Sequence, residues 1–235
     1  MNYIIESKDF IAPNGTVMKA NFRLGTNDRD TLTACIENDD YHFNDFLDPE
    51  QDAVAIDLGC HVAGATLALA ALGYKIHAVE ILPENQEMIL MNLASSGMLG
   101  LVTLYPYAIS DKDSDKIMVG YGDLNTVSGR MHHFMGNTNC SKDDHNLLQL
   151  EVETISLNTI LDSLESCHII KSDCEGGEWK AFSNLTDENL DKITWISAEL
   201  HGDTTERFMG MLRGKFIDVS EEYGMPFGHN LFRKK

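Results

Sequence analysis

From residue 53 onward, short apolar runs alternate with segments of helical pattern, and no other feature of the sequence constrains its fold as strongly. Each run is continuously apolar, as in parallel strands that are covered on both faces. Glycines end the helical segments and a proline begins one of them. The predicted strands are residues 53–57, 75–80, 101–110, 168–173 and 193–200. The predicted helices are residues 65–72 and 83–97, one ending near residue 185, and one at about 203–214.

Both ends of the chain add to this pattern. Residues 216–223, a GMPFG turn and residues 229–235 predict a strand, a turn and a reversed strand. The first 52 residues predict a small strand pair and a helix at about 29–38, packed over one end of the sheet. The expected fold is therefore α/β, with a Rossmann-like, doubly wound sheet, three layers and a C-terminal antiparallel strand.

The 235 residues are enough for one domain with a buried core. Since the sequence has neither an internal repeat nor a linker, we interpret residues 1–235 as a single domain, with an N-terminal cap (1–52) and a core (53–235). A polar insertion, residues 112–156, separates the third and fourth strands and is longer than a connector needs. It is interpreted either as a lid or substrate wall, or as a surface hairpin without a role in binding.

Composition excludes several classes of protein. The chain has 37 acidic and 18 basic residues, and its net charge of −19 disfavours nucleic acid as the main partner. No stretch approaches the roughly 20 apolar residues of a membrane helix, and the N-terminus lacks the pattern of a secretory signal. The five cysteines are scattered without a CxxC pair, which favours free thiols in a reducing compartment and hence the cytoplasm.

The candidate ligand site lies where the first two core strands end. Asp57 closes the first strand, Gly59 begins the turn after it, and Glu80 closes the second strand. In an open parallel sheet these ends face the crevice where ligands bind. Glu80 is expected to accept both hydroxyls of a ribose, and glycine at position 59 to let the backbone approach the ligand. The 21 positions from Gly59 to Glu80 match a strand–helix–strand unit and indicate an adenosine-bearing cofactor.

The turn itself favours S-adenosylmethionine over a dinucleotide. It reads GCHVAG and lacks the second glycine of the GxGxxG pattern, which lets backbone amides reach a pyrophosphate. The carboxylate of Asp57 would repel a pyrophosphate but suits a sulfonium group. An NAD(P)-dependent oxidoreductase remains an alternative, although its catalytic Tyr/Lys or His arrangement cannot be assembled here. A non-catalytic, ligand-binding domain of the same fold is the second alternative.

Seven motifs, in this order and spacing, resemble the FkbM-type methyltransferases of the class I S-adenosylmethionine-dependent superfamily. They are FRLGTNDRDTL, VAIDLGCHVAGA, HAVEILPENQEMILMNL, YAISDKD, VETISLNTIL, IIKSDCEGGEW and ISAELH, and they cover about residues 22–201. The resemblance implies methyl transfer to a hydroxyl of a sugar, a glycan or another small hydroxylated metabolite. One departure is that the family's DxGANxG reads Asp57-Leu-Gly-Cys-His-Val-Ala63, with the glycine displaced to Gly64.

The resemblance also implies a role for each matching position. The methionine half of the cofactor, its ribose and its adenine would each meet a separate group of residues. These are Asp57 and Gly59, with His61 in the following turn, at the methionine half; Glu80 at the ribose; and Ile81, Ala108 and Ile109 around the adenine.

Methyl transfer itself is expected at the ends of the fourth and fifth strands. Asp173 closes the fourth strand, and Glu199 and His201 bracket the end of the fifth. These three residues are the catalytic candidates, either as a general base or as ligands of Mg²⁺ or Mn²⁺, which would lower the pKa of the acceptor hydroxyl. The alternative is that the two carboxylates cap neighbouring helices or brace Lys171.

Overall fold

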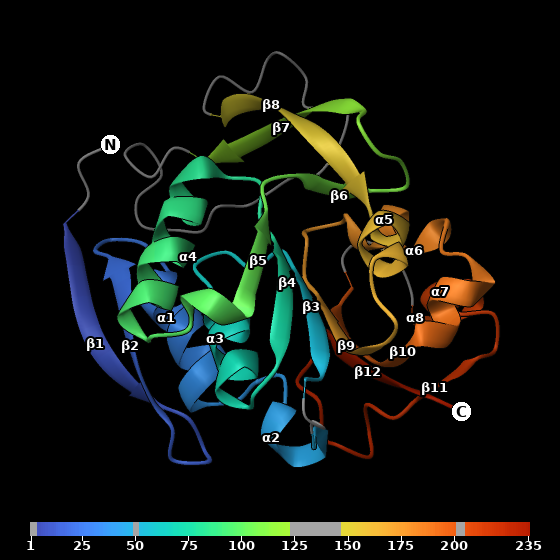
Figure 1. Cartoon of the computed structure of the whole chain (residues 1–235), viewed down its shortest axis with the longest axis horizontal. Helices are drawn as coiled ribbons and strands as arrows, with labels where there is room; N and C mark the ends of the chain where they lie inside the picture. Colours follow the sequence, from blue (N-terminus) through green and yellow to red (C-terminus); the bar gives the residue numbers. More distant parts are fainter. Residues whose placement is uncertain (1–3, 49–51, 123–146, 201–204) are drawn as a thin grey trace.

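The computed structural model describes residues 4–48, 52–122, 147–200 and 205–235. Its centre is a seven-stranded sheet of order β11–β12–β10–β9–β3–β4–β5 (Figure 1). β10, β9, β3, β4 and β5 run parallel to one another, whereas β12 is antiparallel to both of its neighbours, β10 and β11. This confirms the predicted α/β fold with a reversed C-terminal strand. The strands are β3 (Val54–Leu58), β4 (Lys75–Val79), β5 (Val102–Tyr105), β9 (Cys167–Ser172), β10 (Ile193–Glu199), β11 (Phe216–Asp218) and β12 (His229–Lys234).

Helices cover both faces of the sheet. Neighbouring residues of each strand point to opposite sides, so each strand contributes apolar side chains to both faces. Ala55 and Trp195 belong to the apolar cluster on one face, and Ile56 and Ile196 to the cluster on the other. The first face carries α3 (Gly64–Ala71) and α4 (Pro83–Ser95). The second carries α5 (Leu157–Asp162), α6 (Glu178–Ser183), α7 (Asp187–Lys192) and α8 (Thr205–Met211). The predicted start of α8 near residue 203 falls outside the described residues.

The third predicted strand is divided in two. Pro106, which has no amide hydrogen to donate, separates β5 from β6 (Ala108–Ser110). β6 leaves the main sheet and pairs with β8 (Leu147–Ser156), which in turn pairs with β7 (Lys116–Gly122). The predicted insertion therefore contains a strand pair that forms a second, small sheet; its residues 123–146 lie outside the described part of the chain.

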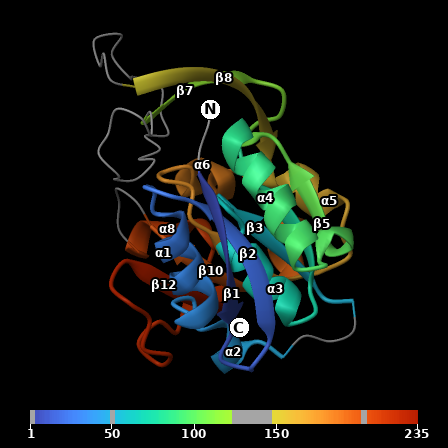
Figure 2. The ribbon, with the colours of Figure 1, turned by 90° about the vertical axis from the view of Figure 1, so that its left-hand side faces the viewer.

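The N-terminal segment forms the predicted strand pair and helix. β1 (Ile5–Ile11) and β2 (Val17–Arg23) are antiparallel, and β2 packs against α4, as Figure 2 shows. The helices α1 (Asp28–Leu32), η1 (Thr33–Glu37) and α2 (Phe43–Phe46) follow. The segment covers one face of the sheet as well as its carboxyl end: the ring centre of Phe46 lies 4.7 Å from that of Trp195 on β10, and the hydroxyl of Tyr41 contacts Asp173, which follows β9.

None of the described helices is long and apolar enough to cross a membrane. The four cysteines among the described residues are free thiols, and Cys140 lies outside those residues. Three of the four are buried, so burial raises the pKa of thiols such as that of Cys35, to about 12.

Candidate functional site

A cavity of about 440 Å³ lies at the carboxyl edge of the sheet, beside the ends of β3, β4 and β9. Its volume is in the range of small-molecule sites. The N-terminal segment contributes Asn27, Thr31, Cys35 and Tyr41 to its wall, and the insertion contributes Ile117. Seven of the predicted site residues line it: Gly59, His61, Glu80, Ile81, Ala108, Ile109 and Asp173.

Gly59 allows the ends of β3 and β9 to pack together. Its φ is +74°, and a Cβ at this position would lie only 1.9 Å from the backbone oxygen of Asp173. The amides of Gly59 and Cys60 both donate to the carbonyl of Val79, at 3.0 and 3.2 Å, and so fix the turn against β4. Close approach to the backbone of Asp173 is therefore one reason for glycine at this position, and the predicted approach to a ligand stays a prediction.

Ala63 stands where the family pattern has glycine, and it takes up a left-handed backbone conformation with φ +75°. That conformation costs a non-glycine residue about 1–2 kcal/mol. The displaced glycine, Gly64, has another role, because a Cβ there would lie 2.9 Å from Sγ of Cys35. Gly64 thus lets η1 pack closely on α3. Ala63 adopts the left-handed backbone conformation that glycine would adopt at the same position.

Glu80 is buried at the end of β4 and lines the cavity. Its Oε2 accepts a hydrogen bond from the amide of His61, and its Oε1 accepts one from the amide of Leu82, each at 2.9 Å. Burial raises the pKa of Glu80 to about 7, against the opposing effect of these bonds. A carboxylate has about four acceptor positions; the side chain of Asn85 and the backbone of Ile81 also act on this one, so hydroxyls of a ligand would share these positions.

An apolar slot flanks Glu80. Ile81 follows Glu80 directly and packs against the apolar cluster that contains Ala108 of β6, and Ile109 follows Ala108; all three line the cavity. The division of the third strand at Pro106 brings these two residues to the cavity wall. The slot has the composition that a flat, apolar ring system such as adenine requires.

Asp57 is not among the described residues that line the cavity, and its predicted place beside the cofactor stays a prediction. Its carboxylate is fully buried, accepts a hydrogen bond from Thr66 Oγ1 at 2.6 Å and lies 3.2 Å from Nζ of Lys171. Lys171 is the register partner of Asp57 on β9, and its ammonium also donates to the carbonyl of Gly59 at 3.0 Å. The negative charge that the sequence offered to a sulfonium is therefore compensated within the protein.

Burial of Lys171 opposes its positive charge, but the electrostatic influence of Asp57, Tyr41 and Asp173 outweighs burial and holds its pKa well above the usual range. Lys171 therefore stays cationic. Lys171 lines the cavity, and its Nζ lies 4.0 Å from Oδ2 of Asp173.

Asp173 is the catalytic candidate that reaches the cavity. Its side chain is 27% exposed, and Oδ2 accepts a hydrogen bond from the hydroxyl of Tyr41 at 3.3 Å. Burial raises the pKa of Tyr41 well above its usual range, so this hydroxyl remains a donor. Tyr41 and Lys171 thus hold one oxygen of the carboxylate from two sides, and ionised Asp173 can accept a proton from a molecule in the cavity.

Of the other two catalytic candidates, one is described by the structure. Glu199 is not among the described residues that line the cavity, and its Oε2 lies 3.6 Å from Nε2 of His229, its register partner on β12. His201 lies outside the described residues, so the predicted metal set of Asp173, Glu199 and His201 stays a prediction. Within the described ranges, no group of three His, Cys, Asp or Glu residues has the arrangement of a metal site.

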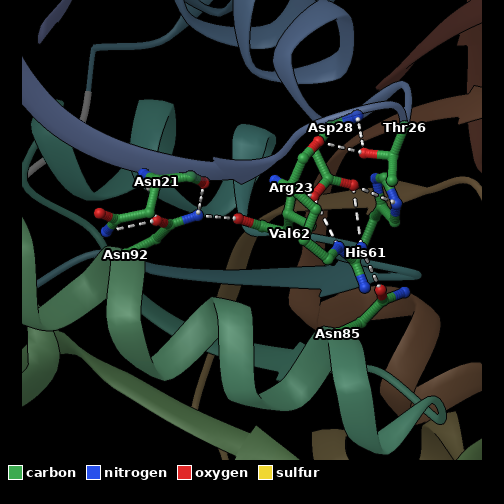
Figure 3. A network of polar contacts seen from close by, with 8 residues as sticks. All are labelled: Asn21, Arg23, Thr26, Asp28, His61, Val62, Asn85 and Asn92. Carbon is green, nitrogen blue, oxygen red and sulfur yellow. Dashed lines mark hydrogen bonds and ion pairs between the residues drawn. The ribbon is translucent and has the colours of Figure 1, made fainter. Parts of the chain in front are cut away.

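Sequence reasoning missed the N-terminal residues that support the site. Arg23 and Asp28 form a buried ion pair beside His61 and Asn85, which Figure 3 shows as one cluster. A second tie joins Asn92 of α4 to the carbonyl of Val62 at 2.8 Å (Figure 3). The two asparagines of α4 are seven residues apart and therefore share a face, and this was the sequence signal for a polar contact with another element.

The sequence of the chain is similar to one family of known proteins. The sequence model of a family described as "Methyltransferase FkbM domain" matches residues 52–224, which is most of the chain. No curated protein matches the sequence.

Several solved structures resemble the chain at low identity. A precorrin-8w decarboxylase from Methanobacterium thermoautotrophicum is 20% identical (TM-score 0.42, 72% of this chain and 67% of that one). A precorrin-6y C5,15-methyltransferase from Geobacter metallireducens is 14% identical (0.40, 72% and 66%), and an rRNA methylase from Streptococcus thermophilus is 10% identical (0.44, 79% and 88%). The family match is thus the comparison on which an assignment depends.

Proposed function

The chain belongs to the FkbM methyltransferase family, and from this premise we propose that it transfers a methyl group from S-adenosylmethionine to a hydroxyl oxygen of a saccharide or another small hydroxylated molecule. One observation carries the proposal. A buried carboxylate beside an apolar slot, from Glu80, Ile81 and Ala108, lines the same cavity as the carboxylate of Asp173. The proposed nucleoside site and the proposed proton acceptor therefore share one cavity.

The residues of the cavity fit the cofactor. Glu80 presents a carboxylate to the two ribose hydroxyls, and Ile81 with Ile109 offers apolar surface to the adenine. Asp57 acts indirectly, because it holds Lys171 and the first turn of α3 in place. His61 and Gly59 lie on the wall beside Asp173 and are assigned to the methionine half.

Asp173 is assigned as the general base. When bound, S-adenosylmethionine supplies a methyl group on a positively charged sulfur, which leaves with the electron pair of the broken carbon–sulfur bond. The acceptor oxygen forms the new bond to carbon, and its proton passes to the carboxylate of Asp173. Tyr41 and Lys171 orient that carboxylate by a hydrogen bond and a nearby positive charge. No step through a metal ion is proposed.

The remaining wall of the cavity supports a hydroxylated acceptor. Tyr107, Trp179 and Arg207 line it, and the guanidinium of Arg207 lies 5.2 Å from the ring centre of Trp179. Aromatic faces bordered by hydrogen-bonding groups suit a sugar ring better than a purely apolar molecule. The net charge of −19 supports the further proposal that nucleic acid is not the acceptor.

The test is a screen of saccharides and hydroxylated metabolites, read by release of S-adenosylhomocysteine. We expect turnover with at least one such acceptor and a loss of about 10²–10⁴-fold in Asp173→Asn, with cofactor affinity unchanged. Methylation of nitrogen or carbon acceptors only, or wild-type turnover in Asp173→Asn, would refute the proposed chemistry. Failure of the wild-type protein to bind S-adenosylhomocysteine in calorimetry would instead favour a non-catalytic domain.

A further inference from the structure

We propose that Arg23 and Asn85 are positioning residues for cofactor binding, which orient the carboxylate of Glu80 toward the ribose hydroxyls. The inference rests on the proposed function, because it assigns the ribose to Glu80. Arg23 precedes the part of the chain that matches the family, residues 52–224, and Asn85 lies on α4. Neither residue was among those predicted to bind the cofactor.

The observation that carries the inference is a closed ring of polar contacts. Nη2 of Arg23 donates to Oδ1 of Asn85 at 2.8 Å; Asn85 lines the cavity beside Glu80, and its side chain lowers the pKa of that carboxyl group. Arg23 is also paired with Asp28, whose Oδ1 lies 3.6 Å from Nε2 of His61. The amide of His61 donates to Glu80 and closes the ring (Figure 3 shows the four members other than Glu80).

The chemistry of arginine fixes the direction of the Asn85 amide. Arginine has donors and no acceptor, so the carbonyl oxygen of Asn85 must face Arg23. The amide nitrogen of Asn85 is then turned to Glu80 as a donor. With the amide rotated by half a turn, an oxygen would instead face the carboxylate and repel it. Arg23 therefore determines which end of Asn85 reaches Glu80.

The ion pair of Arg23 and Asp28 makes this arrangement rigid. Nε of Arg23 donates to Oδ2 of Asp28 at 2.7 Å, Nη2 donates to Oδ1 at 2.9 Å, and the backbone amide of Arg23 donates to Oδ2 at 3.0 Å. Burial raises the pKa of Asp28, but the bonds and charge of Arg23 outweigh it and leave the pKa below the usual value. A bidentate, fully buried pair restricts the guanidinium to one orientation.

The experiment compares two probes in calorimetry: S-adenosylhomocysteine, and its analogue without the 2′ and 3′ hydroxyls. Asn85→Ala is expected to weaken binding of the first by about tenfold, the loss from about one hydrogen bond, and binding of the second by less than about twofold. Asn85→Asp is expected to lose more for the first probe, because its carboxylate keeps Arg23 but repels Glu80. In Glu80→Ala, the further change of Asn85 to Ala should cost nothing.

The matched control is Asn189→Ala. Asn189 is also buried and bridges two helices through its side chain, which donates to Asn158 and Asp162, but it does not line the cavity. It should lower thermal stability without changing either affinity. Equal losses for both probes in Asn85→Ala, or additive losses in the double variant with Glu80→Ala, would overturn the inference. Absence of binding to the wild-type protein would instead remove the proposed function, and the inference with it.

Discussion

The ammonium of Lys171 lies 3.2 Å from the carboxylate of Asp57 on the neighbouring strand, and both side chains are almost completely buried. Lys171→Met would leave Asp57 buried without its partner, and we expect it to lower the free energy of unfolding by about 3–5 kcal/mol. The double variant Asp57→Asn, Lys171→Met should recover most of this loss. Urea unfolding of the three proteins measures the effect. A single variant as stable as the wild type would contradict the pairing.

Tyr41→Phe removes the hydroxyl that donates to Asp173. Turnover should fall by about tenfold, because the base loses one of the contacts that orient it, whereas affinity for S-adenosylhomocysteine should stay within about twofold. Steady-state kinetics and calorimetry separate the two effects.

The control for Tyr41 is Tyr74→Phe. The hydroxyl of Tyr74 is hydrogen-bonded to Nδ1 of His168 at 2.6 Å, and Tyr74 does not line the cavity. This variant loses a buried hydroxyl of the same kind and should keep its turnover. An equal loss of turnover in both variants would show that Tyr41 acts only on stability.

Cofactor affinity should depend on pH through Glu80, whose pKa is raised to about 7 by burial. Ribose hydroxyls donate to the ionised carboxylate, so binding falls with the ionised fraction as the pH drops. Between pH 8 and pH 6 the affinity for S-adenosylhomocysteine should decrease by about tenfold. Glu80→Gln should bind weakly and show little change over the same range. A wild-type affinity that is constant from pH 8 to pH 6 would contradict the ribose assignment.

The same pKa predicts how the stability of the cofactor-free protein varies. The folded state keeps a proton on Glu80 up to about pH 7, whereas the unfolded state releases it near the ordinary glutamate pKa of 4.5. The folded state therefore binds more protons between these values, and the contribution of Glu80 to stability falls as the pH rises through this window. Urea unfolding at pH 5 and pH 8 in the wild type and Glu80→Gln measures that contribution as a difference.

Gly59→Ala and Gly73→Ala separate steric contact from backbone strain. Both glycines have positive φ, but a Cβ at Gly73 meets no atom within 4 Å, whereas one at Gly59 meets the Asp173 carbonyl at 1.9 Å. Gly73→Ala should cost about 1–2 kcal/mol, and Gly59→Ala about 1–3 kcal/mol more. Equal costs in urea unfolding would show that the ends of β3 and β9 have room to separate.

The sheet was predictable because each core strand is a continuous apolar run, and Glu80 was found because the same pattern shows where a strand ends. Two local signals were missed or misread. Thr186 caps α7 by accepting from the amide of Asn189, although the acidic residues after it are typical of a helix start. Residues 101–110 are predicted as one strand, whereas Pro106 divides them between two sheets.

The supporting contacts of the site could not be predicted, because they join residues far apart in the chain. Tyr41 and Asp173 are separated by 132 positions, and Arg23 and Asn85 by 62. The sequence does not show that Asp57 has a partner within the protein, because Lys171 lies on a strand that becomes its neighbour only in the folded sheet. Apolar periodicity predicts which face of a strand is buried, but it does not predict which charges meet there.

The departure of β6 from the main sheet places the proposed adenine wall at the junction of the two sheets. Ile81 follows a strand of the seven-stranded sheet, whereas Ala108 and Ile109 are paired with β8 in the smaller one. Ile81 packs against the apolar cluster of Ala108, Val119 and Val152, so the two sheets meet at this wall. An insertion in the β7–β8 strand pair is therefore expected to change nucleoside affinity.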